Sequence, residues 1–136
     1  MIWFLLILAA VVAGWYLFEG GWDRQLFQAE PGRVCANLNA GQAQAWLRSH
    51  PETQVLDVRS ANEFAGGALP GAVNLSLGSA EFESRVATLD RTKPVLVYCA
   101  GGYRSRKAVA TLKQLGFENI QHLHRGYLSW PTPSQP

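Results

Sequence analysis

One short segment in the second half of the chain constrains the fold more than any other. Residues 94–98 (PVLVY) form an apolar run rich in valine, which is typical of a central strand in a parallel sheet. Cys99, Ala100 and two glycines follow at once, and a helix is then expected over residues 104–115. A strand that passes through a glycine turn into a helix predicts an α/β domain with a mainly parallel sheet.

The remainder of the chain fits the same alternation of short strands and helices. Two more helices and three more strands are expected, over residues 40–49 and 79–89 and over residues 54–58, 72–75 and 120–123. Asn39 is a suitable N-cap for the first of these helices. The length suits one ordinary domain, so we predict a single α/β domain over residues 33–130 and a Pro-rich tail over residues 131–136.

The N-terminal segment has the composition of a membrane helix. Residues 2–18 (IWFLLILAAVVAGWYLF) carry no charged side chain and are close to the lower length limit for crossing a bilayer. Trp3 and Trp15 lie near its two ends, as in the aromatic belts of membrane proteins. A cleaved signal peptide is the main alternative, but no Lys or Arg precedes the apolar run. We predict an uncleaved anchor over residues 1–18 and a juxtamembrane linker over residues 19–32.

Charge indicates where the domain lies and what it does not bind. Arg24 and Arg33 follow the apolar segment, and the count of Lys and Arg leans towards a cytoplasmic domain. The formal net charge is only +2, and the chain has no run of Lys or Arg, so we expect no nucleic-acid partner.

Cys99 is the candidate reactive residue because parallel sheets place ligand sites at the carboxyl ends of their strands. Gly101 and Gly102 allow the backbone to curl, so that successive N–H groups point inward as an anion-binding nest. The N-terminus of the next helix and the guanidinium of Arg104 add positive charge. We therefore expect Cys99 to be largely thiolate near neutral pH, in a cradle that holds an anionic substrate.

Three motifs resemble the rhodanese family in their order and spacing. They are LDVRSANEFAGGALPGAVNLSL over residues 56–77, CAGGYRS over residues 99–105 and GFENIQHLHRGYLSW over residues 116–130. The resemblance implies a rhodanese-like fold, with about five parallel strands flanked by helices, and transfer of sulfane sulfur through a persulfide on Cys99. The side chains and backbone expected to bind the substrate are those of the loop: Ala100, Gly101, Gly102, Tyr103, Arg104 and Ser105.

The resemblance also implies the reaction. The donor is thiosulfate or a related anion, and the acceptor is a thiol, cyanide or a protein partner at the membrane. No metal and no organic cofactor is required. Two positions depart from the usual pattern: Ala68 replaces the His of GHIPG, and Ala100 replaces a residue that is often basic or polar. The first change affects a turn, and the second predicts weaker binding of thiosulfate.

Two other functions are open at this stage. Cysteine phosphatases and arsenate reductases also use a cysteine and an arginine, but their loop is one residue longer than the interval between Cys99 and Arg104. A non-catalytic rhodanese-like module that only binds partners at the membrane is the other alternative. Modules of that kind usually lack the cysteine, which is present here.

Asp57 and Arg59 are predicted to support the site. Asp57 ends its strand at the same edge as Cys99, where it either orients a loop donor or a neighbouring arginine or caps the strand. Arg59 lies four residues before Glu63 and is expected to pair with it, with a contact to substrate as the alternative. Arg106 either adds positive potential near the loop or is solvated helix surface.

The remaining cysteine and the histidines have no assigned chemistry. Cys35 lies far before the loop and is expected to be a small core residue. His50, His122 and His124 lack metal-ligand spacing with the cysteines, so no metal site is predicted. We expect His122 and His124 to lie at the surface.

Overall fold

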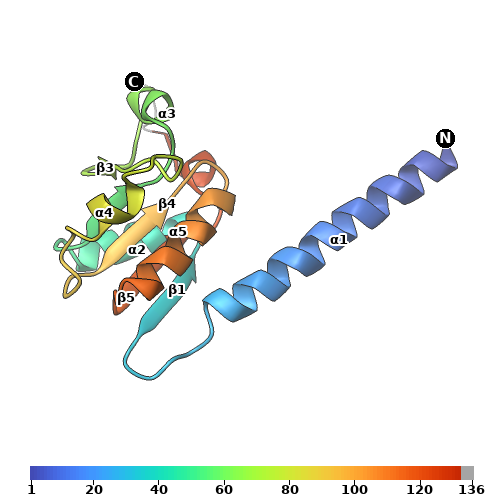
Figure 1. Ribbon diagram of the computed structural model, residues 1–136. Helices are drawn as coiled ribbons and strands as arrows, with labels where there is room; N and C mark the ends of the chain where they lie inside the picture. Colours follow the sequence, from blue (N-terminus) through green and yellow to red (C-terminus); the bar gives the residue numbers. More distant parts are fainter. Residues whose placement is uncertain (133–136) are drawn as a thin grey trace.

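A five-stranded parallel sheet forms the centre of the molecule, as the sequence predicts (Figure 1). The computed structural model describes residues 1–132. Of the Pro-rich tail predicted over residues 131–136, residues 133–136 lie outside the described residues. The elements in chain order are α1 (Ile2–Leu26), β1 (Val34–Leu38), α2 (Ala40–Ser49), β2 (Gln54–Asp57), α3 (Ala61–Ala65), β3 (Val73–Asn74), α4 (Phe82–Val86), β4 (Val95–Tyr98), α5 (Tyr103–Gln114), β5 (Asn119–Leu123) and a short 3₁₀ helix (Tyr127–Ser129).

The strand order is β1-β5-β4-β2-β3, and every neighbouring pair is parallel. From β2 the chain moves outward to β3, and it then returns to the other side of β2 to form β4 and β5. The carboxyl ends of β2 and β4 therefore meet where the strand order reverses. Open α/β sheets bind ligands at such a point.

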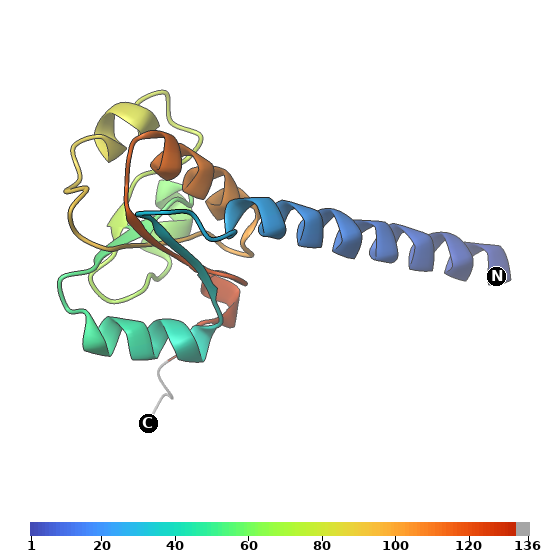
Figure 2. The same cartoon turned by 90° about the horizontal axis from the view of Figure 1, so that it is seen from below.

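Helices cover both faces of the sheet, with α4 and α5 on one face and α2 on the other (Figure 2). Strand β4 is buried along its whole length, which explains its continuous apolar sequence. Val95 and Val97 face the core under α4 and α5, whereas Leu96 and Tyr98 face the core under α2. The core thus consists of two apolar layers separated by the sheet.

Local signals predict the long elements best. Helix α2 has the predicted bounds, because the Asn39 side chain accepts from the Gln42 N–H and the Gln42 side chain accepts from the Asn39 N–H, each at 2.9 Å. The helix expected over residues 79–89 is reduced to α4. On either side of α4, backbone N–H groups donate to the carbonyl oxygen three residues earlier, as from Phe82 to Ser79 and from Leu89 to Val86. These are turns of the 3₁₀ type, not continued α-helix.

Two elements, β1 and α3, are not predicted by the sequence pattern. Strand β1 (VCANL) lies at the edge of the sheet and pairs only with β5, so it carries little of the apolar signal of a central strand. Helix α3 has five residues, too few for a helical period, but Ser60 and Glu63 form a capping box that marks its start.

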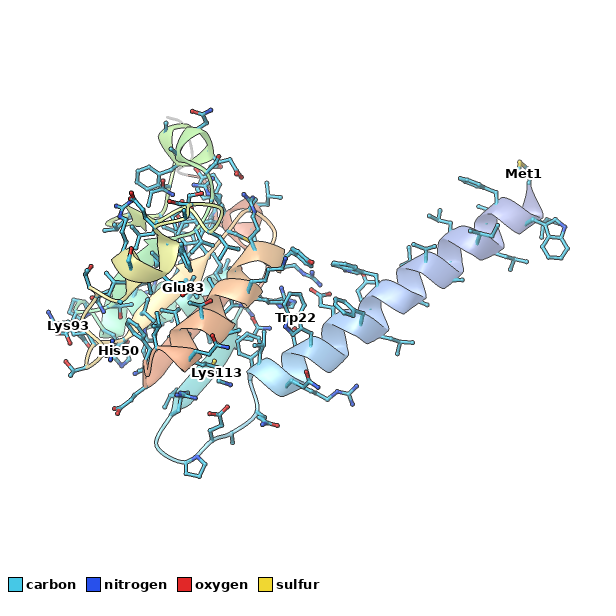
Figure 3. The ribbon with its side chains drawn as sticks, in the orientation of Figure 1. Met1, Trp22, His50, Glu83, Lys93 and Lys113 are labelled. Atoms are coloured by element: carbon cyan, nitrogen blue, oxygen red, sulfur yellow. The ribbon has the colours of Figure 1, made fainter. Side chains whose placement is uncertain are left out.

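Helix α1 does not end at the predicted limit of the anchor. It continues to Leu26, so the first part of the segment predicted as a linker is helical. Glu19 and Leu26 are buried against the domain, and Figure 3 places Trp22 at the junction and Met1 at the far end of the helix. The last turns of α1 are therefore part of the domain surface rather than a free tether.

The N-terminal part of α1 projects away from the domain (Figures 1 and 2). Within residues 1–132, α1 is the one helix long and apolar enough to cross a membrane, with a mean hydropathy of 2.0. Only 6% of the most apolar 18-residue stretch of α1 is buried, whereas the core helix of a soluble protein would be mostly buried.

Candidate functional site

Cys99 directly follows β4 and is only 1% exposed, at the floor of the loop that joins β4 to α5. The loop closes over the sulfur at Gly102, whose N–H donates to Cys99 Sγ at 3.0 Å. Gly102 has φ +105°, and a Cβ at this position would overlap the carbonyl group of His124. A glycine is therefore required for the backbone to reach the sulfur.

Ser105 brings a hydroxyl group to the same sulfur from the first turn of α5. Its Oγ lies 3.3 Å from Cys99 Sγ, 3.1 Å from the Gly102 carbonyl oxygen and 2.6 Å from His122 Nε2. Because α5 begins at Tyr103, the positive end of its dipole also faces the loop. The sulfur thus has a backbone donor, a hydroxyl group and a helix N-terminus around it.

The third sequence motif supports this loop from below. The Tyr127 N–H donates to the Cys99 carbonyl oxygen at 2.8 Å, and the Leu128 N–H donates to the Ala100 carbonyl oxygen at 3.1 Å. Gly126 has φ +62°, and a Cβ there would overlap the carbonyl oxygens of Cys99 and Ala100. The turn after β5 therefore fixes the backbone of the first loop residues.

Arg104, predicted to bind substrate, is held by an ion pair. Its guanidinium donates to both carboxylate oxygens of Glu63, at 2.6 and 2.9 Å. The hydrogen bonds from Arg104 lower the pKa of Glu63 to about 2. An anionic substrate that binds to Arg104 therefore competes with the Glu63 carboxylate for the guanidinium.

The predicted pair between Arg59 and Glu63 is wrong. Helix α3 begins at Ala61, so Arg59 lies before the N-cap, and the four-residue spacing rule does not apply to it. Arg59 instead donates to Asp57, with its closest contact at 2.7 Å, and to the Gly67 carbonyl oxygen at 2.6 Å.

Asp57 and Arg59 form a buried pair at the carboxyl end of β2, with side chains 0% and 4% exposed. The guanidinium of Arg59 also lies over the rings of Tyr98 and Tyr127, at 5.6 and 4.2 Å from their centroids. Of the roles left open for Asp57, the structure favours orientation of the neighbouring arginine. The pair joins β2 to the residues that support the Cys99 loop.

The outer rim of the loop faces α1. The ring of Tyr103 is 46% exposed and lies 5.4 Å from the ring of Trp22 and 6.2 Å from that of Trp15. Gly101 is exposed and Ala100 is half-buried, and neither brings a charged group. Of the predicted substrate-binding residues, the structure therefore brings Gly102 and Ser105 to the sulfur, whereas Arg104 and Tyr103 face other partners.

A buried polar cluster that the sequence pattern does not predict lies behind the loop. His122, expected at the surface, is 0% exposed, and His124 is only partly exposed. Because helices cover both faces of the sheet, residues of β5 that point to either face are buried. A strand expected inside a parallel sheet with two covered faces is the signal that predicts a buried His122. Burial, reinforced by the positive charge of Arg106, lowers the pKa of His122 to about 3.

Arg106 is neither solvated nor free to attract substrate, since its side chain is only 2% exposed. It donates to the two oxygens of Asp23 on α1, at 2.6 and 2.9 Å, and lies 3.1 Å from Glu19. Glu19, Asp23 and His124 are close enough together to hold a cation. Arg106 and Arg125 already neutralise these carboxylates, so the group is a set of ion pairs.

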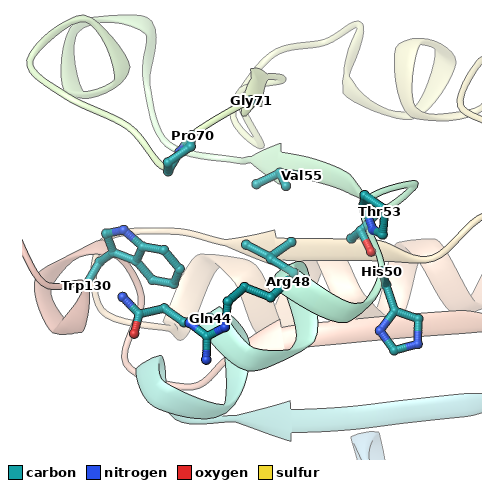
Figure 4. Close-up of a pocket in the computed structure, with 10 residues that line it drawn as sticks. Gln44, Arg48, His50, Thr53, Val55, Pro70, Gly71 and Trp130 are labelled. Atoms are coloured by element: carbon teal, nitrogen blue, oxygen red, sulfur yellow. The ribbon is translucent and has the colours of Figure 1, made fainter.

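A separate groove of about 530 Å³ lies between α2 and the loop before β3 (Figure 4). Its lining residues come from α2 and the turn after it, from β2, from the loop before β3 and from the residue after the 3₁₀ helix: Gln44, Leu47, Arg48, His50, Pro51, Thr53, Val55, Pro70, Gly71 and Trp130. None of them belongs to residues 99–105, so the candidate site remains the Cys99 loop.

Comparisons with known proteins point to one family. The profile of the family described as Rhodanese-like domain matches residues 39–132. The chain is 37% identical over 98 residues to the uncharacterized protein YqhL of Bacillus subtilis, which covers 72% of this chain and 74% of that protein. It is 36% identical over 88 residues to the tRNA uridine(34) hydroxylase of Acaryochloris marina, which covers 62% of this chain but only 28% of that enzyme.

The fold comparison agrees. The crystal structure of a rhodanese-related protein from Thermoplasma volcanium superposes with a TM-score of 0.61 and 32% sequence identity. The match covers 69% of this chain and 88% of that one. The family profile begins at residue 39, so helix α1 lies outside it.

Proposed function

The chain belongs to the rhodanese-like domain family, and we propose that it is a sulfurtransferase that carries sulfane sulfur as a persulfide on Cys99. The observation that carries the proposal is the position of Cys99 Sγ, at the carboxyl end of the central strand and 3.0 Å from the Gly102 nitrogen. A cysteine beside a helix N-terminus and a backbone N–H is suited to nucleophilic chemistry.

The proposed reaction has two half-reactions. The Cys99 thiolate attacks the outer sulfur of thiosulfate or a related donor, the sulfur–sulfur bond of the donor breaks, and sulfite leaves with the electron pair. An acceptor thiol or cyanide then attacks the outer sulfur of the Cys99 persulfide, and Cys99 leaves as the thiolate. Gly102 and the N-terminus of α5 stabilise the negative charge in both steps, and ping-pong kinetics follow.

The loop supports a donor of low charge better than a dianion. Arg104 is paired with Glu63, and Ala100 brings no charge, so little free positive charge remains at the rim. We therefore propose that thiosulfate is a weak donor and that a persulfide of a small thiol or of a protein serves the site better.

We further propose that residues 2–18 of α1 anchor the domain in a membrane, with the domain on the cytoplasmic side. The length and mean hydropathy of α1 and the exposure of its apolar residues support this role. An anchored domain delivers sulfur to a partner at the membrane, so a protein acceptor is included in the proposal.

A phosphatase or arsenate reductase has less support. Arg104 is the arginine that would have to hold the oxyanion in such an enzyme, and it is bound to Glu63. The hydroxylase activity named for one relative belongs to a much longer protein, of which this chain spans 28%.

The experiment uses the full chain in detergent, incubated with thiosulfate or with a small persulfide and weighed by intact-protein mass spectrometry. We expect a gain of one sulfur atom that cyanide removes as thiocyanate. Cys99→Ser should abolish the gain, and Cys35→Ser should keep it. If neither donor nor mercaptopyruvate adds sulfur, the chain is a non-catalytic binding module.

A further inference from the structure

The hydrogen bonds around Cys99 continue through the protein to α1. Ser105 Oγ lies 3.3 Å from Cys99 Sγ and 2.6 Å from His122 Nε2. His122 Nδ1 lies 2.8 Å from Asn37 Oδ1, and Asn37 Nδ2 donates to Asp23 Oδ2 at 3.2 Å. An unbroken series of polar side chains therefore joins the sulfur to a carboxylate on the N-terminal helix.

The carboxylate fixes the orientation of the Asn37 amide and the tautomer of His122. Asp23 only accepts, so the Asn37 amide nitrogen must face it and the amide oxygen must face His122. His122 then carries its proton on Nδ1, and its Nε2 is an acceptor for the Ser105 hydroxyl proton. The Ser105 hydroxyl proton has three acceptors within reach: Cys99 Sγ, the Gly102 carbonyl oxygen and His122 Nε2. When it points along the shortest of these contacts, to Nε2 at 2.6 Å, a lone pair of Ser105 Oγ is left to accept the proton of the Cys99 thiol.

Asp23 is ionised in this arrangement. Burial raises the pKa of its carboxyl group, but the hydrogen bonds and charge of Arg106 outweigh burial, and the net pKa is lowered. The orientation of the Asn37 amide and the tautomer of His122 are therefore fixed across the neutral pH range.

We propose that Ser105 and His122 form a proton relay that converts the Cys99 thiol into the attacking thiolate, which deepens the proposed sulfurtransferase function and rests on it. The thiol proton moves to Ser105 Oγ while the Ser105 hydroxyl proton moves to His122 Nε2. The products are a thiolate, a neutral hydroxyl and an imidazolium, so charge and protons balance without a co-reactant.

Each group keeps a partner after the transfer. Ser105 donates to the thiolate, and the imidazolium donates from Nε2 to Ser105 and from Nδ1 to Asn37. Ser105 touches the reacting atom and is the catalytic residue of the pair, whereas His122 acts through it and is a positioning residue.

The charges that face His122 keep the relay neutral overall. Arg106 from α5 and His124, directly after β5, disfavour the imidazolium, and Asp23 from α1 favours it. The ring of Phe27 stacks on the His122 ring, with 5.5 Å between the centroids. Burial is the largest cause of the lowered pKa of His122, so His122 is neutral before the transfer and holds the transferred proton only while the thiolate attacks. On the other side of Cys99, the Arg104 guanidinium is paired with Glu63.

The test measures alkylation of Cys99 by iodoacetamide as a function of pH, with the full chain in detergent and no sulfur donor. We expect Ser105→Ala and His122→Gln to slow alkylation about tenfold at about pH 7 and to match the wild type at about pH 10, where hydroxide removes the proton directly. His50→Gln, a histidine stacked on Trp46 and outside the relay, should leave the profile unchanged.

Cys35 reports whether each variant is folded. Burial raises the pKa of the Cys35 thiol to about 11, so peptide mass spectrometry should find it unlabelled at about pH 7 unless the chain unfolds. If Cys35 becomes labelled in His122→Gln, that variant is unfolded. The alkylation profile of Ser105→Ala, which removes a single oxygen atom, then tests the relay.

A slowing that is equal at every pH, or no slowing at all, overturns the relay. The sulfurtransferase proposal fails by a different result, namely a wild-type chain with the expected alkylation profile that gains no sulfur from any donor. The two failures are therefore distinguishable.

Discussion

At the scale of single residues, Gly102 has the least freedom in the site. Its backbone is left-handed at φ +105°, and any side chain would overlap the His124 carbonyl group. We expect Gly102→Ala to lower the free energy of unfolding by about 2–3 kcal/mol, because backbone strain and overlap act together. It should also slow Cys99 alkylation, since the N–H that contacts the sulfur is displaced. The matched control is Gly101→Ala, where a Cβ meets nothing within 4 Å. Chemical denaturation of both variants measures the difference, and equal losses would contradict this reading of the loop.

The Glu63 carboxylate limits what Arg104 can do for a donor anion. Glu63→Gln removes the negative charge but keeps a side chain that can form the capping box with Ser60. Arg104 is then free to bind thiosulfate, and we expect the KM for thiosulfate to fall about threefold to tenfold in a cyanide-coupled assay. Glu83→Gln removes an exposed carboxylate on α4 and serves as the control. An unchanged KM in Glu63→Gln would mean that Arg104 does not contact the donor.

At the scale of elements, the sequence predicts best where the signal is local. The apolar run of β4 and the capping box of α2 are readable from neighbouring residues, and both elements are found where they were expected. The contacts that build the site join residues far apart, such as Arg104 with Glu63 and Arg106 with Asp23. No local pattern encodes them. Local signals predict single strands and helices but not the order of the strands in the sheet. The five-stranded fold is predicted from the resemblance of the three motifs to a known family.

The burial of His122 within β5 makes the stability of the sheet depend on pH. Its pKa is about 3 in the folded chain and 6.5 in its ordinary state, so between these values the unfolded chain binds more protons. Stability is therefore fully present above about pH 6.5 and is lost as the pH falls towards 3, by up to about 1.4 kcal/mol per pH unit. Urea midpoints between pH 7 and pH 4 should show this slope, and His122→Gln should reduce it. Burial also lowers the pKa of His124, which accounts for the slope that remains. The Glu63 carboxylate changes the free energy of unfolding only below its ordinary pKa of 4.5. The slope between about pH 4.5 and 6.5 is therefore free of its contribution. A wild-type midpoint that stays constant down to about pH 4 would rule out the effect.

At the scale of the whole molecule, α1 has two parts with different surroundings. The part before Glu19 is apolar and exposed, whereas the last turns carry Glu19, Asp23 and Leu26 into the domain surface. Asp23 is also the end of the polar series that reaches Cys99. The helix that would anchor the protein therefore also completes its interior.

Two truncations separate these parts of α1. Removal of residues 1–18 deletes exposed side chains and the ring contact of Trp15 with Tyr103, so we expect the free energy of unfolding to fall by no more than about 1 kcal/mol, while binding to lipid vesicles in a flotation assay is lost. Removal of residues 1–26 also takes away Glu19 and Asp23, so the Arg106 charge loses both carboxylates and keeps only neutral partners such as the Gly102 carbonyl oxygen, which should cost about 3–5 kcal/mol. In the shorter chain, Arg106→Met should recover part of the loss, because an apolar side chain needs no counter-ion. Equal stability of the two truncated chains, or no recovery with methionine, would show that the ion pairs between α1 and α5 do not hold the domain together.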